Sequence, residues 1–256
     1  MDLSDAYANA AHIPGGDAFP ARWAAEAAAF RAARPFEEVA YGAGAREALD
    51  LFRPEGTPRG LAVVLHGGYW MAFGGRDFSH LAGGALRRGW AVAVPTYPLA
   101  PEARVHAITR AVARAVDRAA GLVPGPVALA GHSAGGHLAL RLACADVALA
   151  CRGRLARVVA VSPLASLVPL LQTGLNATLG MDGAEALAES PVLRPRPDLP
   201  VTAWVGADER PAFRLQSEWL SRAWGADLVV EPGRHHFDVV EGLARPEAEL
   251  AARWAP

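Results

Sequence analysis

Short apolar runs alternate with segments of helical periodicity along most of the chain. Residues 61–65 form an uninterrupted apolar run, which is typical of a strand buried on both faces. Residues 46–52 alternate polar and apolar positions, as expected for an edge strand paired with 39–41. This alternation of strands and helices predicts an α/β fold with a mostly parallel central sheet and helices on both faces. The other expected strands are 90–94, 127–130, 158–161, 201–205 and 228–231, and the expected helices are 76–89, 105–119, 134–150, 212–224 and 237–254.

Two segments do not follow this alternation of strands and helices. Residues 1–35 are rich in alanine, and Pro20 can open a helix with Trp23, Ala27 and Phe30 on one face. We expect this segment to be an N-terminal arm packed on the domain. A second segment, 163–200, is rich in Pro, Gly and Leu and is expected to be a small cap-like insertion. The length of 256 residues fits one domain over 1–256.

Composition narrows the class of partner. Hydrophobic residues make up 52% of the chain, which is enough for a substantial core, and the net charge of −1 without a Lys or Arg run gives no indication of nucleic acid. No apolar run reaches the ~18 residues of a membrane span, and the N-terminus lacks the features of a signal peptide. Cys144 and Cys151 are expected to be buried free thiols. We therefore expect a cytoplasmic protein that acts on a small molecule, and the sequence leaves a homodimer open.

A candidate nucleophile lies between an expected strand and an expected helix. The segment Gly131-His132-Ser133-Ala134-Gly135 matches G-x-S-x-G, the pattern of the nucleophile elbow of α/β-hydrolases. The elbow turn is so tight that the residues two before and two after the serine must lack side chains. Ser133 is therefore the candidate nucleophile, and a helix N-cap is its alternative role.

A glycine-rich loop follows the first buried strand. A hydrolase must stabilise the negative oxygen of a tetrahedral intermediate, and backbone N–H groups of such a loop do this well. Gly68 and Tyr69 are the best candidate donors, with Gly67 in the same loop and Ala134 directly after the nucleophile. These four residues are the expected oxyanion hole.

The aromatic residues of this loop are candidates for a substrate pocket. Tyr69 and Trp70 can form its walls together with His132 beside the nucleophile, although simple packing is an equal alternative for Trp70. His66 is interpreted as a residue that shapes the loop. The remaining histidines have no metal-ligand spacing, so no metal site is expected.

The order of a serine triad along such a chain is Ser, acid, His. Asp208 lies in the turn after the expected strand 201–205 and is the candidate acid, with Glu209 as its nearest rival. His236 lies in the loop after the last strand and is the candidate base, with His235 as the competing choice.

Three motifs in the sequence together carry a family resemblance: His66-Gly67-Gly68-Tyr69-Trp70, Gly131-His132-Ser133-Ala134-Gly135-Gly136-His137-Leu138 and His236-Phe237-Asp238-Val239-Val240-Glu241. Over most of residues 37–245 the chain resembles the bacterial kynurenine formamidase (arylformamidase) group of α/β-hydrolases. The resemblance implies hydrolysis of N-formylkynurenine to kynurenine and formate in tryptophan catabolism. It also implies the triad Ser133, Asp208 and His236, with neither a metal nor an organic cofactor.

Other functions remain open at this point. A carboxylesterase acting on short-chain acyl esters would use the same triad, and turnover of formyl against acetyl substrates would discriminate the two. A lyase on this fold can also use it. A non-catalytic binding protein is disfavoured, because the triad positions and the oxyanion glycines all hold competent residues.

Overall fold

A central eight-stranded sheet organises the molecule in the computed structural model, which describes residues 2–256. The strands lie in the order β1-β2-β4-β3-β5-β6-β7-β8. β1 and β2 pair antiparallel with each other, β2 pairs antiparallel with β4, and all other neighbours are parallel. The strands are β1 Glu37–Ala40, β2 Ala48–Phe52, β3 Leu61–Leu65, β4 Ala91–Pro95, β5 Val127–His132, β6 Leu155–Val161, β7 Val201–Gly206 and β8 Asp227–Glu231.

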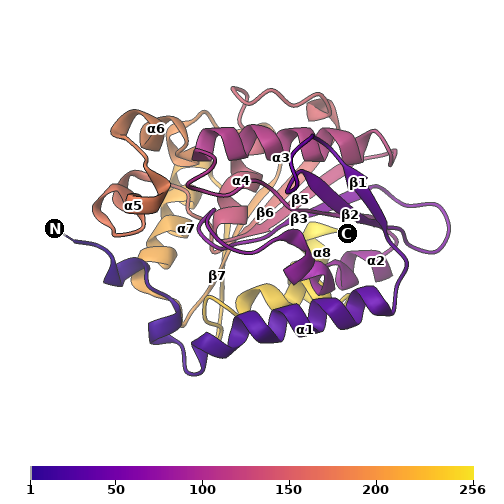
Figure 1. Cartoon of the computed structure of the whole chain (residues 1–256), viewed down its shortest axis with the longest axis horizontal. Coiled ribbons are helices and arrows are strands. Elements are labelled where there is room, and N and C mark those ends of the chain that lie inside the picture. The colour runs from indigo at the N-terminus through magenta and orange to yellow at the C-terminus, as the bar shows by residue number, and fades with distance from the viewer. Residues whose placement is uncertain (1) are drawn as a thin grey trace.

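Helices cover both faces of the sheet (Figure 1). Side chains of α3, α4 and α7 form one apolar core with one face of the sheet, and those of α1, α2 and α8 form a second core with the other face. Both cores are built from side chains that the helical spacing directs toward the sheet. The helices are α1 Phe19–Ala32, α2 Gly83–Arg87, α3 Val105–Ala120, α4 Ala134–Ala143, α5 Asn176–Leu179, α6 Gly183–Ala188, α7 Pro211–Trp224 and α8 Glu249–Trp254.

The expected α/β class is confirmed, and three expected helices have different extents. Residues 76–89 divide into the 3-10 helix Gly75–Ala82 and the short α2. α4 ends at Ala143 because Cys144 is extended. The expected C-terminal helix is interrupted between the 3-10 helix Val239–Ala244 and α8, where Pro246 cannot continue a helical hydrogen-bond ladder. Across the described part of the chain, no helix combines the length and apolarity needed to cross a bilayer.

The N-terminal arm begins with irregular structure and then packs on the domain. Three short 3-10 helices between residues 5 and 18 precede α1, which has Pro20 in its first turn as expected. α1 buries Phe19, Trp23 and Ala27, and Trp23 meets Phe78 at 5.2 Å between ring centroids. The segment between β6 and β7 forms α5, α6 and 3-10 turns at the same end of the molecule as the start of the chain (Figure 1).

A buried ion pair ties this insertion to the helix behind the candidate nucleophile. Arg141 on α4 donates from Nε to Glu189 at 3.2 Å, and their side chains are 3% and 7% exposed. Thr109 on α3 donates to the same carboxylate at 2.8 Å. Arg141 also pairs with Asp146 near the surface at 3.0 Å. Loss of Glu189 would leave the buried Arg141 charge with only the half-exposed Asp146 as its acidic partner, which compensates it less well.

Glu189→Ala is therefore expected to lower the free energy of unfolding by on the order of 3 kcal/mol, measured by urea denaturation. The matched control is Glu218→Ala on α7, which removes an exposed pair with Arg222. That variant should change stability by well under about 1 kcal/mol. Equal losses in the two variants would contradict the role assigned to the buried pair.

Candidate active site

Ser133 lies in a strained turn between β5 and α4. Its φ of 56° and ψ of −117° are unfavourable for a residue with a side chain, and its N–H donates to Val161 O at 2.8 Å. A Cβ on Gly131 would lie 2.1 Å from Gly135 O, and one on Gly135 would lie 2.1 Å from Leu65 O. Both glycines are thus required by close backbone approach, and the expected elbow is present.

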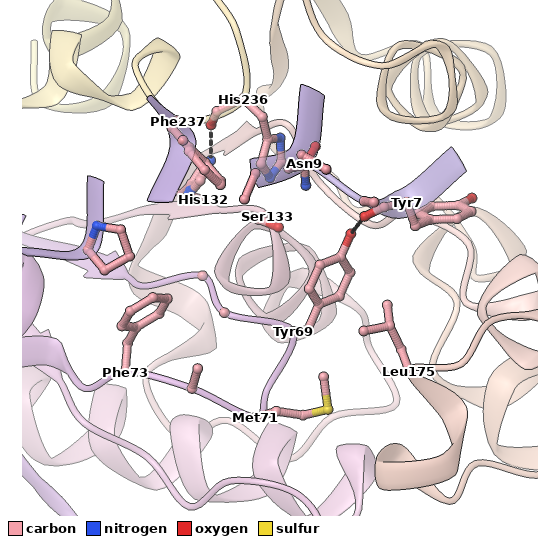
Figure 2. Close-up of a pocket in the computed structure, with 18 of the residues that line it drawn as sticks. Tyr7, Asn9, Tyr69, Met71, Phe73, His132, Ser133, Leu175, His236 and Phe237 are labelled. Atoms are coloured by element: carbon pink, nitrogen blue, oxygen red, sulfur yellow. Dashed lines mark hydrogen bonds between the residues drawn. The ribbon is translucent and has the colours of Figure 1, made fainter. Parts of the chain in front are cut away.

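His236 reaches the same pocket as Ser133 from the loop after β8. The histidine is 3% exposed, and its Nδ1 lies 2.7 Å from Glu209 Oε2. Donation of the Nδ1 proton to this carboxylate leaves Nε2 as the acceptor nitrogen. In Figure 2 the His236 imidazole lies beside the Ser133 side chain at the pocket wall. No hydrogen bond among residues 2–256 joins these two side chains, and such contacts commonly tighten only when substrate binds.

The carboxylate beside His236 belongs to Glu209 and not to Asp208, so the expected acid is corrected by one position. Asp208 is exposed, and it contacts the histidine loop only through its backbone N–H, which donates to Arg234 O at 2.9 Å. The Glu209 carboxylate is fully buried and accepts hydrogen bonds from His236, from Ser162 Oγ at 2.5 Å and from Gly206 N at 2.8 Å. The turn after β7 directs one side chain outward and the next one inward. The sequence shows that Asp208 and Glu209 are adjacent, but it does not show which of the two side chains the turn points toward the protein interior.

His235 has a different role from His236. Its ring packs against Phe19 at 5.3 Å between centroids, and its Nδ1 accepts the N–H of Phe237 at 3.2 Å. Asp238 accepts the N–H of His235 at 2.8 Å. His235 therefore helps to form the turn that holds His236 in position, and it does not line the pocket.

The glycine-rich loop passes directly beside the nucleophile. A Cβ on Gly67 would lie 3.2 Å from Ser133 Cβ, and Gly68 and Tyr69 have φ values of 104° and 51°. Gly67, Gly68 and Tyr69 line the pocket, and the backbone hydrogen bonds of residues 2–256 leave the N–H groups of Gly68 and Tyr69 unused. Ala134 is the first residue of α4, where N–H groups have no acceptor within the helix. The four expected oxyanion residues thus surround Ser133.

Trp70 does not line this pocket, contrary to expectation. It is fully buried in the core, with its ring edge-on to His137 at 5.0 Å. Positive φ values at both Tyr69 and Trp70 turn the loop sharply, so Tyr69 faces the pocket and Trp70 faces the core. His132 does line the pocket, and its Nε2 donates to His236 O at 2.7 Å. It thereby links the elbow to the loop of the candidate base.

His66 shapes the glycine-rich loop, as its place in the sequence indicated. Its ring stacks on Tyr97 at 4.0 Å between centroids, and its Nδ1 lies 2.8 Å from Gly67 O. Burial lowers the pKa of His66 to about 3, so this ring is neutral at pH 7. A neutral ring can keep its Nδ1 proton on the Gly67 carbonyl but is too weak a base for the role given to His236.

The pocket has a volume of about 870 Å³ and mostly apolar walls. Trp23, Phe73, Phe78 and Phe237 form an aromatic side, while Leu175 comes from the insertion. Tyr7, Ala8 and Asn9 of the N-terminal arm complete the pocket (Figure 2), and nothing in the sequence pattern pointed to them. Within residues 2–256, no group of three or more His, Cys, Asp or Glu side chains is arranged to hold a metal ion.

Comparisons with known proteins agree with the observed fold. A family model described as the alpha/beta hydrolase fold matches residues 62–212. The kynurenine formamidase of Salmo salar is 30% identical over 83% of this chain and 78% of its own length, and that of Danio rerio is 28% identical over 80% and 76%.

Solved structures are also similar. A crystal structure from Silicibacter sp., provisionally described as a thioesterase, is 50% identical with a TM-score of 0.98, and each chain is covered completely. An esterase of Pyrobaculum calidifontis has a TM-score of 0.68 over 93% of this chain and 89% of its own, at 22% identity, and supports the fold alone.

Four histidines that are shielded from solvent make stability depend on pH. Burial lowers the pKa of His66 to about 3 and those of His80 and His137 to about 4, and it holds the pKa of His132 well below its usual range. The unfolded chain takes up these protons near pH 6.5 and the folded chain does not. The free energy of unfolding should therefore be constant above about pH 6.5 and fall toward pH 4, by ~1.4 kcal/mol per pH unit for each histidine.

Urea denaturation between pH 7 and pH 5 measures this slope. His137→Gln can retain a donor for Glu189 O, which the histidine contacts at 2.7 Å, but it cannot titrate. The variant should reduce the slope by about one proton. A stability that does not change between pH 7 and pH 5 would show that these rings are not held neutral by burial.

Proposed function

This chain belongs to the α/β-hydrolase fold family, and from that membership we propose that it is a serine hydrolase of aryl formamides, with N-formylkynurenine as substrate. The observation that carries the proposal is the buried Glu209–His236 hydrogen bond in the pocket that Ser133 shares with the glycine-rich loop. The kynurenine formamidases among its relatives support the choice of a formamide.

Attack on the formyl carbon begins with Ser133. Nε2 of His236 takes the proton from the Ser133 hydroxyl as its oxygen bonds to the formyl carbon. Glu209 holds the imidazole in the required tautomer through Nδ1 and stabilises the positive ring that forms. The N–H groups of the loop and of Ala134 receive the negative oxygen, and each such donor contributes about 10²–10³ in rate.

Departure of the aryl amine needs a proton, because an anilide anion leaves poorly. His236 returns the proton that it took from Ser133 to the leaving nitrogen. The C–N bond then breaks, and the formyl group remains as an ester of Ser133. Water activated by His236 hydrolyses this ester, which releases formate and restores the free hydroxyl.

The pocket suits an aromatic leaving group. Its aromatic side can stack or pack edge-to-face with a substrate ring, while the backbone near Gly67 and Ser133 leaves space for a small acyl group. The face made by Trp23, Phe73 and Phe237 is therefore the proposed binding site for the substrate's ring.

Ester or thioester hydrolysis is the second candidate function. It is favoured by the 50% identical structure that is provisionally described as a thioesterase. The chemistry needs the same Ser133, His236 and Glu209. A cavity of about 870 Å³ also has room for an acyl group larger than formyl. The two candidates differ in the acyl group and the leaving atom, not in the machinery.

Hydrolysis of N-formylkynurenine, measured beside a short p-nitrophenyl ester for wild type and Ser133→Ala, tests the proposal. We expect strong formamidase activity in the wild type and a loss of at least ~10³-fold in the variant. Ester turnover without formamidase activity would retain the nucleophile and reject the substrate. Activity that survives Ser133→Ala on both compounds would reject the mechanism.

A paired substitution tests the acid. Glu209→Gln should lower kcat about 10³–10⁴-fold, because an amide can no longer hold the correct tautomer or stabilise the charged imidazole. Asp208→Asn is the matched control, since that side chain is exposed, and should keep activity close to wild type. The reverse ranking would restore Asp208 as the acid.

A further inference from the structure

The N-terminal segment, defined here as residues 2–18, is fixed across the mouth of the pocket. Tyr69 OH donates to Tyr7 O at 2.6 Å, and Gln216 on α7 donates to Tyr7 OH at 3.0 Å. Leu3 N donates to Gln172 O at 2.8 Å, which attaches the segment to the insertion. These contacts join the segment to the glycine-rich loop, to α7 and to the insertion, so it is a built wall of the site.

Asn9 is a buried polar residue of this wall and lines the pocket, as the more exposed Ser4 and Asp17 do. The residue is only 8% exposed, and its Oδ1 is buried without a donor among the described residues. Figure 2 shows the side-chain amide directed toward the space between Ser133 and Tyr69. The Asn9 amide therefore has hydrogen-bonding capacity that no described residue uses, on the wall that faces the nucleophile.

The nitrogen of Asn9 has a hydrogen available for a ligand. Burial raises the pKa of the Tyr69 phenol, and the Asn9 side chain beside it opposes that rise. A carboxamide nitrogen carries two hydrogens, so at least one is free for a ligand atom in the pocket that Asn9 lines. Two other donors near Ser133 are already engaged, because Tyr69 OH donates to Tyr7 O and His132 Nε2 donates to His236 O.

We propose that Asn9 determines specificity by donating a hydrogen bond from Nδ2 to a carbonyl oxygen on the leaving group, ortho to the scissile formamide. This inference rests on the proposed function. In the proposed mechanism, the N–H groups of the loop and of Ala134 bind the oxygen of the scissile formamide, and His236 protonates the leaving nitrogen. In an ortho-acyl formanilide, the ring carbonyl is the remaining polar atom close to the reaction centre, and it can accept from a neutral donor such as a carboxamide.

The test compares two substrates that differ only in this carbonyl, ortho-acetylformanilide and formanilide. Asn9→Leu removes the donor at similar size, and Asn9→Asp removes it while keeping a polar group. Both variants should lower kcat/KM for ortho-acetylformanilide by about 10- to 100-fold and leave formanilide nearly unchanged. Ser4→Ala is the matched control, because it removes the Oγ contact with Gly174 N from the same segment. It should affect both substrates equally.

A second readout does not depend on formamide turnover. 2-Aminoacetophenone and aniline are tested as inhibitors of p-nitrophenyl ester hydrolysis, with the melting temperature of each variant measured alongside. Asn9→Leu should weaken inhibition by 2-aminoacetophenone about tenfold and leave aniline unchanged. If wild type cleaves no formamide, the proposed function fails, and this assay still decides the role of Asn9. Equal losses on both compounds of either pair, or no loss on either, would overturn the inference.

Discussion

The buried carboxylate of Glu209 is the interaction on which the site depends. It accepts hydrogen bonds from the end of β6 through Ser162, from the end of β7 through Gly206 and from the loop after β8 through His236. A buried charge is tolerated only when its lone pairs are satisfied, so these three backbone segments cannot move independently. The same contacts that stabilise the carboxylate therefore fix the position and tautomer of the imidazole.

Strand topology supplies the other half of the site. β3 and β5 are parallel neighbours, with Leu65 opposite Gly131, so the loop and the turn that follow them emerge side by side. Gly135 approaches Leu65 O so closely that a Cβ would lie 2.1 Å from it. The strained φ of Ser133 persists because β5, α4 and this contact over-determine the turn. The proposed nucleophile and oxyanion donors are thus brought together by backbone packing before any ligand binds.

Local sequence patterns were enough to predict most of the fold and part of the candidate site. The strand at 61–65 and the helix after Pro20 follow from apolar runs and turn residues, and Ser133 follows from its flanking glycines. The sequence pointed to Asp208 in place of Glu209, because the two acidic residues are adjacent in the turn after β7. Only the backbone conformation of that turn shows which of the two side chains faces His236. The placement of Trp70 in the core and of Asn9 in the pocket depends on contacts between segments far apart in the sequence. No periodicity encodes such contacts.

Substrate choice depends in part on segments that lie outside the residues matched by the family model. The family model spans residues 62–212, which include the loop and the elbow but neither His236 nor the N-terminal segment. The loop and the elbow within this span serve the proposed covalent acyl chemistry, which amide and ester hydrolysis share. Part of the proposed leaving-group side of the pocket lies outside that span, namely residues 2–18, Trp23 of α1 and Phe237. Hydrolases that share these motifs can therefore differ in substrate through segments outside them, and Asn9 lies in such a segment and lines the same pocket as Ser133 (Figure 2).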